Sequence, residues 1–266
     1  MSRPFLKMNG LGNDFVVVEA RHAPFAPGPD EARAIADRAS GIGCDQLIAI
    51  EPSANADAFM RIWNADGGEV GACGNATRCV GWLLMNATGK DEAVIETQGG
   101  LLPVRRAGPN AVSVDMGEPR LAWNDIPLAR QMGTRTLDFS AGGLSDPGAV
   151  SMGNPHVVFF TEDVDLAATI GPAVEHDPLF PEAVNVGFAR VEAPDRIRLR
   201  VWERGAGLTK ACGTGACAAL VAASRRDLTG RRATLVLDGG ELDIDWREDG
   251  HVIMTGAVAV EFEGTL

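Results

Sequence analysis

Residues 72–79 read ACGNATRC, and residues 211–218 read ACGTGACA. In both stretches a cysteine is followed by a glycine and a small polar residue, at a point where a helix is expected to begin. The two leading cysteines, Cys73 and Cys212, are 139 positions apart (212 − 73), about half of the 266-residue chain. The repeated motif therefore predicts that the chain contains two copies of one structural unit.

The spacing of 139 recurs outside the cysteine motifs. Residues 61–64 (RIWN) match residues 200–203 (RVWE), and Gln46 matches Asn185. With a slip of two residues, 12–17 (GNDFVV) also match 153–158 (GNPHVV). Three matches in the same order make chance a poor explanation and support a duplication.

The order of predicted elements is the same in both halves. Each half has an apolar strand, a helix, two strands, a glycine-rich turn, a second helix and then strands. The expected helices are 30–39, one from residue 73, 163–170 and 212–230, and the expected strands are 15–18, 46–50, 59–63, 93–97, 101–105, 111–116, 157–160, 185–191, 196–202, 233–237, 242–246 and 251–261. We predict an α+β fold of two pseudo-symmetric homologous domains. The proline-rich stretch 119–127 places the boundary near Pro119, giving domains 1–118 and 119–259.

Composition excludes several classes of protein. The hydrophobic content of 45% is typical of a soluble globular protein. The net charge of −12 disfavours nucleic acid and acidic membranes as partners. No apolar run approaches the roughly 18 residues of a membrane span, and the N-terminus has no signal-peptide pattern. We therefore expect a cytoplasmic protein whose five cysteines are reduced.

The cysteines allow several interpretations. Zinc binding is disfavoured because the spacings of the pairs Cys73/Cys79 and Cys212/Cys217 turn the two thiols of each pair roughly 240° and 140° apart on a helix. Burial in the core suits Cys79 and Cys217, which share helical spacing with apolar residues. A thiol redox pair is disfavoured because no C-x-x-C motif is present.

Acid–base catalysis explains the leading cysteines best. A helix N-terminus lowers the pKa of a thiol by favouring the thiolate. A thiolate and a thiol that approach one carbon from opposite faces would invert its configuration. The backbone N–H groups of Gly74, Asn75, Gly213 and Thr214 could hold the carboxylate on which negative charge develops.

The sequence predicts chemistry without a cofactor. It has no Gly-x-Gly-x-x-Gly after a strand, no Walker lysine loop and no plausible metal cluster among its four histidines. None of the three lysines, Lys7, Lys90 and Lys210, lies in an apolar, pocket-like context.

Polar residues at strand ends repeat with the duplication and predict a hydrogen-bonding pocket: Asn13, Gln46, Asn64, Asn154 and Asn185. Any one asparagine alone would be read as a turn residue. The Glu203-Arg204 pair breaks the symmetry, since the first half has Asn64-Ala65 there. Arg204 suits a substrate carboxylate, and Glu203 suits an ammonium group. His156 either tunes a cysteine or is simply structural.

The chain resembles the diaminopimelate epimerase family along essentially its whole length. The resemblance rests on residues 7–15 (KMNGLGNDF), 43–46 (GCDQ), 72–75 (ACGN), 153–156 (GNPH), 202–207 (WERGAG) and 211–215 (ACGTG). Asn9, where the family often has histidine, and Cys44, at a variable position, are departures that do not bear on the chemistry.

This resemblance implies cofactor-independent interconversion of LL- and meso-2,6-diaminopimelate, on the route to lysine and peptidoglycan precursors. It implies two curved mixed sheets, each wrapped around a central helix, with the substrate in the cleft between the domains and residues 260–266 returning to the first. Cys73 and Cys212 would be base and acid, with His156 and Glu203 adjusting the thiols. The substrate-binding residues would be Asn13, Gln46, Asn64, Gly74, Asn75, Asn154, Asn185, Glu203, Arg204, Gly213 and Thr214. A homodimer is also implied.

Two alternatives remain at this stage. A proline racemase-like enzyme would use the same cysteine pair, but its substrate has no second charged end for Arg204 to bind. The related phenazine-pathway isomerases are not among these alternatives, because they share the duplicated fold but do not carry this cysteine pair. A non-enzymatic thiol- or zinc-binding protein is the alternative of a different class.

Overall fold

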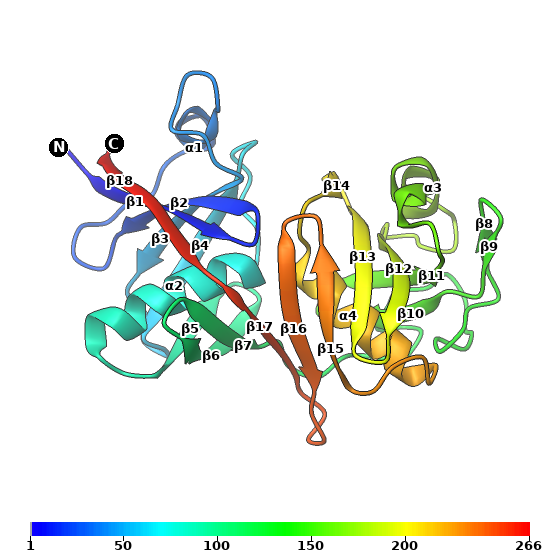
Figure 1. The fold of residues 1–266 in the computed structure, drawn as a ribbon. Coiled ribbons are helices and arrows are strands. Elements are labelled where there is room, and N and C mark those ends of the chain that lie inside the picture. Colours follow the sequence, from blue (N-terminus) through cyan, green and yellow to red (C-terminus); the bar gives the residue numbers. More distant parts are fainter. Residues whose placement is uncertain (1) are drawn as a thin grey trace. The chain divides into compact units, whose positions relative to one another are not determined.

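The computed structural model describes residues 2–266, which divide into two compact units. The first unit runs to Asp115 and also includes Thr255–Leu266, and the second unit is Met116–Met254 (Figure 1). The chain therefore passes between the units at 115/116 and again at 254/255, where the sequence had suggested 118/119 and 259/260.

The first unit is a mixed sheet with a helix on each side. Its strand order is β7-β6-β5-β4-β3-β2-β1-β18. The strands are β1 (Pro4–Gly10), β2 (Asn13–Glu19), β3 (Gln46–Glu51), β4 (Ala58–Asn64), β5 (Glu92–Thr97), β6 (Gly100–Gly108), β7 (Ala111–Asp115) and β18 (Ala259–Thr265). Helix α2 (Gly74–Thr88) packs against β1, β5, β6 and β7, while α1 (Pro29–Ala36) packs against β3 and β4.

The second unit repeats this arrangement. Its strand order is β10-β11-β12-β13-β15-β16-β17, with β14 paired to β13. The strands are β10 (Gly148–Ser151), β11 (Pro155–Phe160), β12 (Asn185–Ala193), β13 (Arg196–Glu203), β14 (Gly207–Thr209), β15 (Arg232–Leu237), β16 (Gly240–Trp246) and β17 (Val252–Ala257), and the small hairpin β8 (Ser140–Ala141) and β9 (Leu144–Ser145) lies apart from them. Strand β17 begins in this unit and passes into the first unit at Thr255. Helix α4 (Gly213–Arg225) packs against β10 and β16, and α3 (Ala167–Glu175) packs against β12 and β13.

Strand register confirms that the two units are copies. In the first unit, β2 runs parallel to β3, with Phe15 opposite Gln46. In the second, β11 runs parallel to β12, with His156 opposite Asn185. These pairs differ in number by 141 and 139 (156 − 15 and 185 − 46), which are the two offsets found in the sequence. The predicted α+β class with two repeated units is therefore confirmed.

Small residues let the central helices approach their sheets. A Cβ atom at Gly81, on α2, would lie 2.8 Å from a methyl group of Val104 on β6. On β1, a Cβ atom at Gly10 would lie 2.9 Å from the carbonyl oxygen of Asn75. Cys79 and Cys217 are fully buried on α2 and α4, as their helical spacing predicted. Tight packing therefore holds the first turn of α2 against the end of β1.

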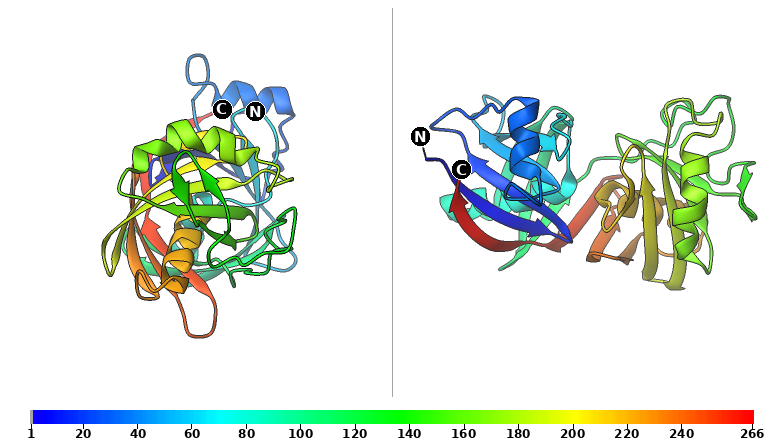
Figure 2. Two further views of the ribbon diagram at one scale, coloured as in Figure 1. Left: turned by 90° about the vertical axis from the view of Figure 1, so that its right-hand side faces the viewer. Right: turned by 90° about the horizontal axis from the view of Figure 1, so that it is seen from above.

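Several predicted elements have different bounds. The predicted strand 251–261 is wrong, because the chain is interrupted at Val258, whose N–H donates to the carbonyl of Asn110 and separates β17 from β18. Strand β18 pairs with β1, as Figure 2 shows for the red and dark blue strands. The predicted helix 30–39 ends at Ala36 because Asp37 is extended. The predicted helix 163–170 is a 3₁₀ turn η1 (Val164–Leu166) followed by α3.

Candidate functional site

Cys73 and Cys212 occupy the same position in their units. Each is the N-cap residue of the central helix, with an extended backbone (φ −149° and −125°). Gly74 and Asn75 begin α2, and Gly213 and Thr214 begin α4. The first N–H groups of a helix have no intrahelical acceptor and carry partial positive charge. Each unit therefore presents a thiol together with N–H donors that suit a carboxylate.

Cys212 lies in a buried setting that favours the protonated thiol. Its residue is only 4% exposed, and burial, followed by the nearby carboxylate of Glu203, raises the pKa of the thiol well above its usual value. The hydroxyl group of Thr214, 3.6 Å from the sulfur, and the amide of Gly215 lower the pKa of Cys212. Burial also raises the pKa of Glu203, whose carboxylate accepts a hydrogen bond from Thr209.

Thr214 links His156 to Cys212. Nε2 of His156 lies 3.0 Å from Oδ1 of Asn154 and 3.1 Å from Oγ1 of Thr214. Burial, and then the charge of Arg204, lowers the pKa of His156 to about 3, so the ring is neutral near pH 7. Because Asn154 Oδ1 can only accept, Nε2 carries the proton. Asn154 Nδ2 donates to Thr214 Oγ1 at 3.3 Å, which leaves the Thr214 proton for the sulfur.

The polar residues of the first unit form two bonded pairs. Asn75 Nδ2 donates to Asn13 Oδ1 at 2.7 Å, so the start of α2 is tied to the start of β2. Gln46 Nε2 donates to Asn64 Oδ1 at 3.0 Å, across neighbouring strand ends. Within residues 2–266, the buried Oε1 of Gln46 has no hydrogen-bond partner. That oxygen is an acceptor suited to an N–H group of a ligand.

Asn185 and Arg204 hold the turn that follows β13. Asn185 Nδ2 donates to the carbonyl of Pro155 at 2.8 Å, and its Oδ1 accepts from the backbone N–H of Arg204 at 2.9 Å. The exposed side chain of Arg204 donates from Nη1 to the carbonyl of Glu182 at 3.0 Å. Asn185 therefore positions the backbone, while the remaining guanidinium donors of Arg204 suit a carboxylate.

Three features near these residues were missed by the sequence analysis. Lys7 is buried, contrary to the expected setting of the lysines, and lies 2.5 Å from Asp14. Arg78 is fully buried on α2. Glu175 accepts from the indole of Trp202 and from the N–H of Gly205, both at 2.7 Å. For Lys7, one usable signal was its place in the KMNGLGNDF motif; the others had none.

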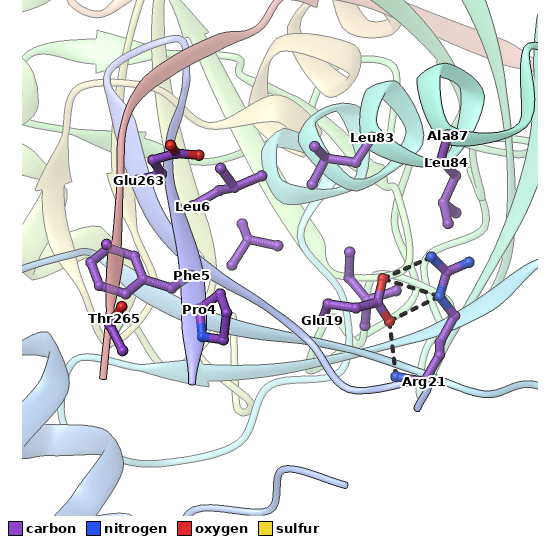
Figure 3. A pocket seen from close by; sticks show the side chains of 13 residues that line it. Pro4, Phe5, Leu6, Glu19, Arg21, Leu83, Leu84, Ala87, Glu263 and Thr265 are labelled. Atoms are coloured by element: carbon purple, nitrogen blue, oxygen red, sulfur yellow. Dashed lines mark hydrogen bonds and ion pairs between the residues drawn. The ribbon is translucent and has the colours of Figure 1, made fainter. Parts of the chain in front are cut away.

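A pocket lies elsewhere in the first unit. It has a volume of about 710 Å³ and is lined by apolar residues of β1, β2 and α2, with the ion pair Glu19–Arg21 at one side (Figure 3). Across residues 2–266, its lining includes none of the predicted site residues. Of its charged side chains, Glu19 and Arg21 bind each other, and the described lining contains no cysteine and no start of a helix.

In the part of the chain that the structure describes, no group of three or more His, Cys, Asp or Glu side chains is arranged to hold a metal ion. Nor does any helix between residues 2 and 266 combine the length and the apolar character needed to span a bilayer. All five cysteines are free thiols.

Comparison with known proteins identifies the family. The family model for diaminopimelate epimerase matches residues 5–122 and 148–261, which include both cysteine motifs. The chain belongs to the diaminopimelate epimerase family. This confirms the family prediction. A diaminopimelate epimerase of Phenylobacterium zucineum (strain HLK1) is 70% identical over 100% of this chain and 98% of that protein.

Solved structures of more distant proteins share the fold of this family member. A phenazine biosynthesis protein of the PhzF family from Bacillus anthracis has a TM-score of 0.72 at 14% identity, covering 100% of this chain and 99% of that one. A hydroxyproline epimerase from Agrobacterium vitis has a TM-score of 0.67 at 15% identity, covering 100% and 91%. At such identities the likeness concerns the fold alone.

Proposed function

We propose that this chain interconverts LL- and meso-2,6-diaminopimelate by a two-cysteine mechanism that needs no cofactor. The proposal rests on one observation above all: a member of this family carries a cysteine at the N-cap of the central helix in each of its two copies. A two-base inversion of a stereocentre uses two proton-transfer groups of this kind, one for each face of the carbon.

In the proposed step, the Cys73 thiolate takes the α-proton of the LL substrate, and the Cys212 thiol delivers its proton to the opposite face. The C–H bond on one face breaks, a C–H bond on the other face forms, and the enzyme is left with a Cys73 thiol and a Cys212 thiolate. The reverse reaction starts from that state. This mechanism requires both thiols to reach one carbon when the substrate is bound.

The surroundings of Cys212 support this assignment of the resting state. Its burial and the neighbouring Glu203 carboxylate favour the thiol, so Cys212 is the proton donor before LL substrate reacts. Cys73 is half-buried at the positive end of α2, which favours a thiolate. The asymmetry follows from sequence, since Asn64 is the counterpart of Glu203 in the first unit.

Substrate recognition is proposed to divide between the reacting and distal ends. The N–H groups at the start of α2 and α4 would hold the reacting carboxylate and stabilise the charge that develops on it. The amides of Asn13, Gln46, Asn64 and Asn154, together with Arg204, would bind the ammonium and carboxylate groups that remain. Asn185 would support Arg204 through its backbone, as its hydrogen bonds suggest.

Incubation with LL-diaminopimelate in deuterated water tests the proposal. We expect deuterium at the α-carbon, measured by mass spectrometry, together with meso product, measured by chiral chromatography. Cys73→Ala and Cys212→Ala should abolish epimerisation. Cys217→Ala is the matched control, because it removes a buried thiol from the same helix as Cys212 without changing an N-cap. Exchange of deuterium into proline but not diaminopimelate would show that the substrate is wrong.

We further propose that the chain forms a homodimer through β18. This strand pairs with β1, and the residues described here place no strand on its other edge. Val260 and Phe262 on β18 are 44% and 49% exposed, which is unusual for large apolar side chains on an open edge. Sedimentation should show a dimer that Phe262→Asp dissociates, and a wild-type monomer at micromolar concentration would contradict the proposal.

A further inference from the structure

A chain of hydrogen bonds crosses the first unit from a buried cation to a carboxylate. Arg78 Nη1 donates to Asn75 Oδ1 at 2.9 Å, and Asn75 Nδ2 donates to Asn13 Oδ1 at 2.7 Å. Asn13 Nδ2 then donates to Asp45 Oδ2 at 3.1 Å. Two amides proposed to bind substrate thus lie between two charged residues that the sequence analysis did not assign.

The charged ends determine which way both amides point. A guanidinium can only donate hydrogen bonds, and a carboxylate can only accept them. Each amide between them has one donating and one accepting end. If Asn13 or Asn75 were turned over, a pair of donors or a pair of acceptors would face each other. A single orientation of both amides therefore satisfies all three hydrogen bonds.

Further contacts hold the carboxylate end in place. Asp45 Oδ2 also accepts from the backbone N–H of Asp14 at 3.1 Å, and Asp45 Oδ1 accepts from Arg38 at 2.7 Å. Arg38 binds both oxygens of Asp14, which lies 2.5 Å from the buried Lys7. Although burial opposes it, hydrogen bonds from Arg38 and Lys7 hold the pKa of Asp14 well below its usual value.

Arg78 is a charged residue whose side chain is completely buried. The residue is 0% exposed, and burying a guanidinium costs free energy that an apolar side chain on α2 would not cost. Its counterpart in the second unit, at an offset of 139, is Cys217, which is uncharged and equally buried. There the bonded pair Asn154–Thr214 meets the neutral ring of His156 instead of a cation.

We infer that Arg78 and Asp45 are positioning residues that set the direction of the Asn75 and Asn13 amides for substrate binding. In this orientation the second N–H of each Nδ2 and the second lone pair of each Oδ1 are left for other partners. The inference rests on the proposed function, because Asn13 and Asn75 are site residues only if that function holds. It explains why the duplication fails at residue 78.

Arg78→Met and Arg78→Lys separate polarity from packing. A lysine keeps a donor-only group beside Asn75, whereas methionine keeps only the bulk. We expect Arg78→Met to raise KM for diaminopimelate at least tenfold, and Arg78→Lys to keep it within about threefold of wild type. Asp45→Ala, at a half-exposed position that is safer for folding, should also raise KM at least tenfold. Asp30→Asn, in an exposed ion pair of the same unit, is the control and should change nothing.

A second readout does not depend on activity. In NMR spectra of ¹⁵N-labelled protein, the side-chain amides of Asn13 and Asn75 should give sharp, slowly exchanging signals. These signals should broaden or exchange at least tenfold faster in Arg78→Met and in Asp45→Ala, but not in Arg78→Lys. The inference would be overturned if the amide signals and KM were unchanged in both Arg78→Met and Asp45→Ala. It would also be overturned if Arg78→Lys and Arg78→Met changed KM and the amide signals equally. An inactive wild type with the expected NMR changes would instead contradict the proposed function alone.

Discussion

The sulfur of Cys212 lies 3.6 Å from the hydroxyl oxygen of Thr214. That hydroxyl stabilises the thiolate, so Thr214→Val should raise the pKa of Cys212 further and move the alkaline limb of the kcat/KM profile to higher pH. A hydrogen bond to a charged group contributes about 1.5–3 kcal/mol, so kcat/KM should fall at least about tenfold. Because the equilibrium between the two isomers is fixed, the loss must be the same in both directions.

Thr214→Ser is the control for this prediction. It keeps the hydroxyl group and the backbone N–H at the start of α4, so both the profile and the rate should stay close to wild type. If the serine and valine variants lose equal activity, the methyl group of Thr214 matters and its hydroxyl group does not.

Replacing Glu203 should have the opposite effect on the same thiol. Glu203→Gln removes a negative charge that raises the pKa of Cys212. The pKa should therefore fall, and the alkaline limb of kcat/KM should move to lower pH. Glu248→Gln makes the same chemical change at an exposed position of the second unit and should leave the limb in place. A limb that moves upward in Glu203→Gln would refute the assigned role.

The duplication could be predicted from the sequence because the two halves keep the same residue types where the backbone conformation is most restricted. Gly67, with φ of +85°, and Gly205, with φ of +73°, form the turns before the two central helices. Strand β1 was not predicted although its apolar residues alternate with Lys7 and Asn9, a pattern typical of a half-buried strand. The burial of Lys7, which bonds Asp14 and Gly43, was also not predicted. Such tertiary pairing has no local signal.

The site residues that could be predicted are those defined by their position at the start of a helix. Cys73 and Cys212 were expected at helix starts, and both are N-caps. The partners of those residues were not predictable. Arg78 reads as a surface cation in a helix, and Asp45 reads as a turn residue, yet they bracket Asn75 and Asn13. Contacts between distant segments decide such roles, and spacing along the chain does not encode them.

His156 should make the stability of the protein depend on acid. Its pKa is about 3 in the folded chain and about 6.5 when unfolded, so the unfolded state binds the extra proton between these values. The His156 contribution to stability is therefore complete above pH 6.5 and is lost as the pH falls toward 3, at up to about 1.4 kcal/mol per pH unit.

His156→Gln should thus show a shallower loss of the free energy of unfolding between pH 6 and pH 4, measured by urea titration. His22→Gln, at an exposed position of the first unit, is the matched control and should keep the wild-type slope. Parallel curves for His156→Gln and wild type would mean that the ring is not held neutral by burial.

Gly215 is required for the space around the Cys212 thiol. A Cβ atom at residue 215 would lie 3.1 Å from the sulfur of Cys212 and 3.0 Å from a methyl group of Val201. Gly215→Ala should therefore displace the thiol and reduce kcat at least tenfold. Overpacking of about 1–3 kcal/mol is offset in part by roughly 1 kcal/mol of helix propensity, so the free energy of unfolding should fall by about 0–2 kcal/mol. Gly230→Ala, where a Cβ meets nothing within 4 Å, should leave kcat unchanged. A Gly215→Ala variant with full activity would show that the thiol tolerates movement.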